Sequence, residues 1–62
     1  MPIVQMEILK GRTLDQKRKM VKKVTTAVTE TLDCPKEAVR IIIIEMEPEN
    51  FAVGGDLKVD SK

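Results

Sequence analysis

The sequence predicts an α/β (α+β) fold: a single β-α-β unit with parallel strands and a short C-terminal hairpin, completed by oligomerisation. Three observations support this prediction. Apolar residues near the start alternate with a period of two, a longer segment carries them at helical spacing, and a run of four isoleucines follows. Because one helix fits between the two strand-like segments, the strands should lie parallel in one sheet. We expect one small domain spanning 1–62.

The first strand is predicted over residues 2–9. Val4, Met6 and Ile8 fall on one face, and polar residues interrupt the other face. This pattern is typical of a strand with one well-buried face. Residues 10–12 then form a loop.

The helix is predicted from about Leu14 to Thr31. Thr13 and Gln16 fit the capping-box pattern, in which each side chain accepts a backbone N–H of the other residue. The segment 33–35 should end the helix, since it closes with a proline. The apolar positions that recur at helical spacing are Leu14, Met20, Val21, Val24, Ala27, Val28 and Leu32. The cluster of basic residues expected on the solvated helix surface is Lys17, Arg18, Lys19, Lys22 and Lys23.

The second strand is predicted over residues 39–46. Its isoleucines at 41–44 are β-branched and show no polar alternation, which suits a strand covered on both faces, as in a parallel sheet. Residues 47–50 should form a turn. Residues 51–55 are expected to form a short strand or hairpin, and 56–62 a polar tail.

An isolated chain of this design would leave much apolar surface uncovered. One helix covers only one face of a two-stranded sheet, so the other face and both edges stay open. Cys34 is the only cysteine and histidine is absent, so neither an intramolecular disulfide nor a structural zinc site should stabilise so small a domain. We therefore expect a symmetric homo-oligomer, although periodicity does not give the number of copies.

Composition also limits the classes of function. Eleven Lys and Arg against ten Asp and Glu give a formal charge of +1, which argues weakly against a dedicated nucleic-acid binder. The absence of histidine excludes Ser-His-Asp and Cys-His catalysis. No apolar run is long enough to span a membrane and no signal peptide opens the chain, so we expect a cytoplasmic protein.

Pro2 is the residue with the clearest potential for acid–base chemistry. A proline in second position usually permits removal of the initiator methionine, which would expose a secondary amine. An α-amino group has an unperturbed pKa of about 7.7 to 8.0, and desolvation beside an apolar strand or nearby arginine charge would lower that pKa. The alternative is that Pro2 only begins an edge strand, where proline is tolerated.

Two arginines occupy positions that suggest anion binding. Arg12 lies in the loop that leaves the first strand, and Arg40 stands at the start of a strongly apolar strand. A planar guanidinium can bind a carboxylate through two parallel hydrogen bonds, whereas the alternative role of Arg40 is an intersubunit salt bridge. Phe51, the lone aromatic residue, is either a core or interface residue or the wall of a small pocket.

Taken together, these features resemble the 4-oxalocrotonate tautomerase family over almost the whole chain. The resemblance implies a β-α-β unit with an amino-terminal proline. It also implies a homohexamer built as a trimer of dimers, in which each active site draws on neighbouring subunits. The residues and segments that carry the resemblance, in order, are Pro2, Gly11-Arg12-Thr13, Asp15-Gln16-Lys17, Arg40, Ile44-Glu45-Met46, Phe51 and Gly54-Gly55.

The resemblance also implies roles for individual residues. Pro2, freed from Met1, would be the general base that moves a proton in an unsaturated 2-hydroxy or 2-oxo dicarboxylate from catabolism of aromatic-ring cleavage products. Arg40 would bind the reacting end of the substrate, Arg12 its far carboxylate, Phe51 would form an apolar wall, and Leu9 would lie beside the pocket. No metal or organic cofactor is implied.

Two other functions stay open at this point. The same residues would serve a related dehalogenase or hydratase acting on short unsaturated acids, although no glutamate is clearly placed to activate water. From a different class, the chain could be a non-catalytic oligomeric scaffold in which the arginines form interface ion pairs.

Overall fold

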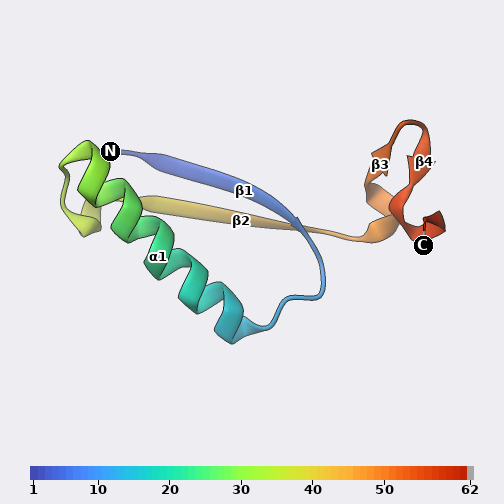
Figure 1. Cartoon of the computed structure of the whole chain (residues 1–62), viewed down its shortest axis with the longest axis horizontal. Helices are drawn as coiled ribbons and strands as arrows, with labels where there is room; N and C mark the ends of the chain where they lie inside the picture. The colour runs from blue at the N-terminus through green and yellow to red at the C-terminus, as the bar shows by residue number, and fades with distance from the viewer. Residues whose placement is uncertain (62) are drawn as a thin grey trace.

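The computed structural model describes residues 1–61. Its strands and helix follow one another in the order β-α-β and then a hairpin (Figure 1). These elements are β1 (Ile3–Leu9), α1 (Leu14–Leu32), β2 (Arg40–Met46), β3 (Ala52–Val53) and β4 (Asp56–Leu57). Three short 3₁₀ turns join or end them: η1 (Lys36–Ala38), η2 (Pro48–Asn50) and η3 (Lys58–Asp60).

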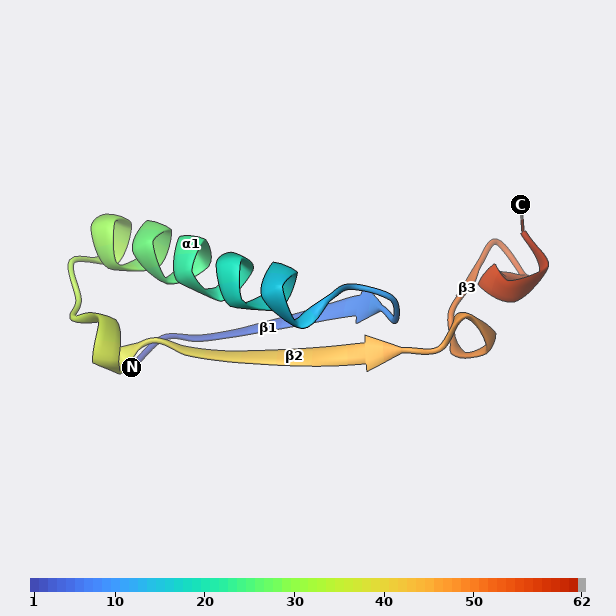
Figure 2. The same ribbon diagram turned by 90° about the horizontal axis from the view of Figure 1, so that it is seen from below.

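Strands β1 and β2 pair in parallel, as the sequence predicted. The register runs from Ile3 opposite Arg40 to Leu9 opposite Met46. Helix α1 returns the chain to the amino end of the sheet and lies on one side of the two strands (Figure 2). The β-α-β prediction is therefore confirmed.

The ends of α1 follow from local sequence. The hydroxyl oxygen of Thr13 accepts the backbone N–H of Gln16 at 3.1 Å, and the Gln16 side-chain oxygen accepts the backbone N–H of Thr13 at 2.9 Å. This capping box satisfies two backbone donors. At the other end, Asp33 adopts a left-handed conformation with φ of +51°, and the helix ends at Leu32, one residue later than predicted.

Helix α1 packs on the sheet through one stripe of half-buried residues. Three of the apolar positions predicted to face the sheet, Leu14, Ala27 and Leu32, are exposed, because they lie off the side of the helix that faces the sheet. The half-buried residues of the stripe on α1 are Lys17, Met20, Val21, Val24, Thr25, Val28 and Thr29. On the sheet, the half-buried apolar residues facing them are Val4, Met6, Ile8, Ile41 and Ile43.

The face of the sheet turned away from α1 is uncovered in the isolated chain. Ile42 and Ile44 remain 47% and 37% exposed there. The isoleucine strand is thus covered on one face only. No side chain among residues 1–61 is fully buried, and the chain is elongated, measuring 43 × 24 × 14 Å. A chain that buries so little apolar surface lacks the main stabilising term of a folded protein until something covers this face.

The predicted short C-terminal hairpin is confirmed, but its second strand lies at the start of the segment 56–62 that was predicted to be a polar tail. Strand β4 pairs antiparallel with β3, and the turn uses Gly54 and Gly55, whose φ values of +61° and +92° suit a tight two-residue hairpin turn. The tail prediction was wrong for β4, because two-residue strands are too short to show alternation. Lys62 lies outside the described residues. The hairpin stands beyond the carboxyl end of β2, apart from α1 (Figure 1).

Within residues 1–61, no helix has the length and apolar character needed to cross a membrane.

Candidate active site

The structure brings Pro2 and Arg40 together at one end of the sheet. Pro2 directly precedes β1, and Arg40 is the first residue of β2. The backbone N–H of Arg40 donates to the carbonyl oxygen of Pro2 at 3.0 Å. Parallel pairing places the amino ends of the two strands side by side, so residues far apart in sequence become neighbours.

The arginines differ in whether they have a carboxylate partner. Arg18 pairs with Asp15 at 2.7 Å on the helix surface, as expected for a solvated face. Among residues 1–61, neither Arg12 nor Arg40 has a carboxylate within salt-bridge distance. The guanidinium of Arg40 instead donates through Nη1 to the carbonyl oxygen of Glu37. Both arginines therefore keep donors for an external anion.

Leu9 and Arg12 lie at the opposite end of β1 from Pro2 (Figure 1). The strand is seven residues long. Pro2 and Leu9 are therefore about 23 Å apart, at roughly 3.3 Å per residue of parallel strand. Arg12 follows in the loop after Gly11, whose φ of +133° favours glycine. The structure does not bring Leu9 or Arg12 to the Pro2 of the same chain.

Arg12 lines a small hollow between β1 and the first turns of α1, with a volume of about 240 Å³. Ile8 and Met20 give this hollow an apolar part, and Gln16 and Lys17 add polar groups. A cationic side chain beside an apolar floor suits the carboxylate end of a small organic acid.

Lys17 is a residue that the sequence pattern misplaced. It was predicted to belong to the solvated helix surface, but its side chain is only 23% exposed and its Nζ lies 2.8 Å from Oε1 of Glu45. The signal for this position was present, because Lys17 precedes Met20 and Val21 by three and four residues and so shares their side of the helix. The pair links α1 to β2 beside the hollow of Arg12.

Phe51 also lies far from Pro2 within one chain. Turn η2 carries it past the carboxyl end of β2, and its carbonyl oxygen accepts the backbone N–H of Lys58 at 2.7 Å. Its side chain is 36% exposed. A hollow of about 220 Å³ in the hairpin is lined by Phe51, Val53, Asp56, Lys58 and Ser61.

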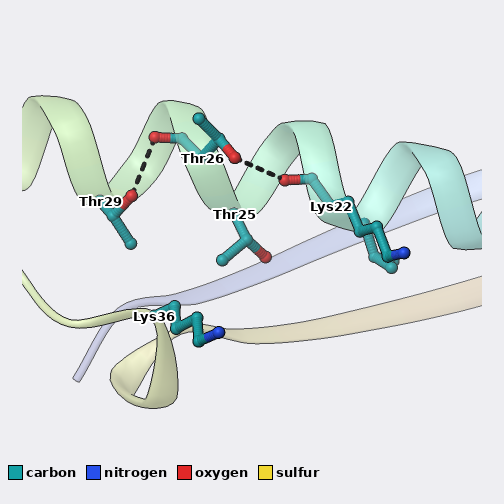
Figure 3. Close-up of a pocket in the computed structure, with 6 residues that line it drawn as sticks. Lys22, Thr25, Thr26, Thr29 and Lys36 are labelled. Atoms are coloured by element: carbon teal, nitrogen blue, oxygen red, sulfur yellow. Dashed lines mark hydrogen bonds between the residues drawn. The ribbon is translucent and has the colours of Figure 1, made fainter.

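A third hollow, of about 490 Å³, contains none of the predicted site residues. It lies between α1 and η1, where Lys22 and Lys36 flank a row of threonines (Figure 3). The hydroxyl of Thr26 donates to the Lys22 carbonyl and that of Thr29 to the Thr26 carbonyl, each at 3.0 Å. The hydroxyl protons of Thr26 and Thr29 are therefore bound to the helix backbone.

Pro2 can act as a base only when Met1 is absent. In a chain that begins at Met1, the Pro2 nitrogen belongs to a peptide bond, and its lone pair is delocalised into the carbonyl group. Met1 is 78% exposed, so the bond to Pro2 stands at an accessible end of the chain. Residues 1–61 contain no group of three or more His, Cys, Asp or Glu side chains that could hold a metal ion.

Comparison with known proteins shows which family this chain matches. A family profile described as tautomerase enzyme matches residues 2–61. A 2-hydroxymuconate tautomerase of Pseudomonas putida is 44% identical over 57 residues, which cover 92% of this chain and 90% of that protein.

Solved structures agree with these matches. A structure of a 4-oxalocrotonate tautomerase isozyme from Methylibium petroleiphilum superposes with a TM-score of 0.91 at 46% identity, covering 94% of this chain and 91% of the other. A heterohexameric 4-oxalocrotonate tautomerase from Chloroflexus aurantiacus gives a TM-score of 0.93 at 29% identity, with both chains fully covered.

Proposed function

Because this chain belongs to the tautomerase enzyme family, we propose that it is a cofactor-free tautomerase acting on unsaturated 2-hydroxy or 2-oxo dicarboxylates, with Pro2 as its general base. The conversion of 2-hydroxymuconate to 2-oxo-3-hexenedioate is the type reaction. The observation that carries the proposal is the main-chain hydrogen bond between Arg40 and Pro2. It joins the residue that would expose a terminal amine once Met1 is removed to an arginine that has no carboxylate partner among residues 1–61. A pathway that degrades aromatic-ring cleavage products would supply such a substrate.

The proton transfer uses one amine and no other base. The neutral nitrogen of Pro2 removes the proton of the substrate's 2-hydroxyl group, leaving a dienolate, and then delivers that proton to a distal carbon of the conjugated chain. Pro2 returns to its neutral form, so no further reactant is consumed. Arg40 donates hydrogen bonds to the carboxylate and the oxygen at the reacting end, and it stabilises the charge that develops there.

The remaining site residues must reach Pro2 from another copy of the chain. Within one chain, Arg12, Leu9 and Phe51 lie at the other end of the sheet from Pro2. In an oligomer whose chains lie head to tail, Arg12 of one copy holds the far carboxylate of a substrate whose reacting end sits at Pro2 of another. Phe51 and Leu9 then supply apolar walls. The uncovered isoleucine face supports such an assembly, and the heterohexameric relative supports six subunits.

The experiment that tests this function is the ketonisation of 2-hydroxymuconate, followed by ultraviolet absorbance. The protein used is one whose mass shows that Met1 has been removed. We expect rapid turnover with no added metal or cofactor, and a rate that rises with pH as the amine loses its proton. A rate no higher than that in buffer would reject the tautomerase proposal for this substrate, and shorter or halogenated unsaturated acids would then be assayed with the same protein.

A further inference from the structure

The turn η1, just before β2, binds the side chain of Arg40. The backbone N–H of Ala38 donates to the Pro35 carbonyl at 3.0 Å, and that of Val39 donates to the Lys36 carbonyl at 3.1 Å. The next carbonyl, that of Glu37, accepts Nη1 of Arg40 at 2.5 Å. The turn thus ends with a main-chain acceptor directed at the guanidinium.

This contact is what the chemistry of a helix end favours. The last carbonyl groups of a helical turn receive no N–H donor from within the turn, and a cationic side chain can donate to them. A guanidinium has five N–H donors in a rigid plane, so one bond to Glu37 leaves donors free on the rest of the group. Because the backbone N–H of Arg40 also donates to Pro2, Arg40 is held through both its main chain and its side chain before any ligand binds.

We infer that η1 is a positioning segment, in which the main-chain carbonyl of Glu37 fixes the Arg40 guanidinium so that its free donors face a carboxylate bound beside Pro2. Holding the side chain in advance lowers the conformational entropy lost when the carboxylate binds. The inference rests on the proposed function for the identity of that carboxylate. It assigns the role to a carbonyl group, so the Glu37 side chain has no part in it.

Two backbone esters in the chain from Pro2 to Lys62, made by chemical synthesis, separate this role from the stability of the turn. Replacing Ala38 by its α-hydroxy acid turns the Glu37–Ala38 peptide bond into an ester, which weakens the Glu37 carbonyl as an acceptor and removes the Ala38 N–H. The matched control replaces Lys36 in the same way and weakens the Pro35 carbonyl. The first ester removes the hydrogen bond from Ala38 to Pro35, and the control ester weakens it at the acceptor, so both loosen the turn. Only the first one weakens the acceptor of Arg40.

The first measurement is calorimetric binding of adipate, a dicarboxylate that cannot tautomerise. We expect the Glu37–Ala38 ester to bind it about three- to tenfold more weakly than the control ester, in line with the loss of part of one hydrogen bond to a charged group. The KM for 2-hydroxymuconate should rise by a similar factor, with a smaller change in kcat. Equal affinities of the two esters, or no binding by the unmodified chain, would overturn the inference.

The same measurements keep the proposed function separate. An unmodified chain that binds adipate but does not turn over 2-hydroxymuconate refutes the tautomerase proposal, while the difference between the two esters still decides the role of η1. Conversely, rapid turnover with equal affinities of both esters supports the tautomerase and rejects the positioning role.

Discussion

The carbonyl oxygen of Pro2 accepts the backbone N–H of Arg40 at 3.0 Å, across the amino ends of two parallel strands. This single bond joins the proposed base to the proposed anion-binding residue. It is a main-chain contact, so substitution of either side chain other than by proline at position 40 leaves the donor and the acceptor in place. Side-chain variants at these two positions therefore test chemistry with little effect on the strand pairing.

Removal of Met1 is expected to decide whether the protein is active. A chain that retains Met1 has an amide at Pro2 and should lose about 10²–10⁴-fold in kcat/KM, the usual contribution of a general base. Pro2→Ala with Met1 removed keeps a primary amine and should be impaired less severely. Mass spectrometry identifies the terminus of each preparation, and ultraviolet assay gives the rates. Full activity of the Met1-retaining chain would exclude Pro2 as base.

Arg12 and Arg40 should respond differently to the length of the substrate. Arg40→Ala is expected to raise KM and lower kcat together, reducing kcat/KM by about 10²-fold, because it removes two charge-assisted hydrogen bonds at the reacting end. Arg12→Ala should raise the KM for the dicarboxylate about tenfold. The KM for a monocarboxylate that lacks the far carboxylate should stay nearly unchanged. Gel filtration of each variant shows whether the oligomer persists. A normal rate with a dissociated oligomer would assign Arg40 to an intersubunit salt bridge instead.

Mixed oligomers test whether one site combines two chains. Pro2→Ala and Arg12→Ala chains are each impaired alone, and after refolding together about one quarter of the sites should contain both native residues if these come from different copies. The mixture should then recover a comparable fraction of the wild-type rate. Mixing the two preparations without unfolding is the control. No recovery after refolding would place Pro2 and Arg12 of the same chain in one site.

Association should depend on the uncovered face of the sheet. Ile42→Asp places a charge among isoleucines and is expected to weaken association at least about tenfold, since an unpaired carboxylate resists burial. Ile42→Val keeps the surface apolar and serves as the matched variant. Sedimentation over a range of protein concentrations measures the association of both variants. Unchanged assembly of Ile42→Asp would mean that this face stays exposed to solvent in the oligomer.

The capping box of α1 should contribute measurably to stability. Thr13→Ala removes the acceptor for the Gln16 N–H and is expected to lower the free energy of unfolding by about 1 kcal/mol. Thr26→Ala, which removes a hydroxyl bonded only to the helix backbone, should change it by less than about 0.5 kcal/mol. Urea unfolding at fixed protein concentration compares the free energies of unfolding of the two variants. Equal losses in the two variants would argue against a special role for the cap.

The elements could be predicted from sequence because each has a strong local signal. The capping residues Thr13 and Gln16 mark the start of α1, and period-two alternation and the isoleucine run mark β1 and β2. The hairpin strand β4 was missed because two residues carry no period. The charge of Lys17 predicts a solvated side chain, but its place on the helical stripe turns it toward the sheet, where Glu45 compensates that charge.

The sequence by itself determined which residues could do chemistry, since Pro2, Arg12, Arg40 and Phe51 are scarce residue types at unusual positions. Only the tertiary structure decided which of them meet. Parallel pairing brings Pro2 to Arg40, and the length of β1 separates both from Arg12. The contact of Arg40 with the Glu37 carbonyl left no mark in the sequence, because every residue has a main-chain carbonyl and only the path of the chain determines what that group binds.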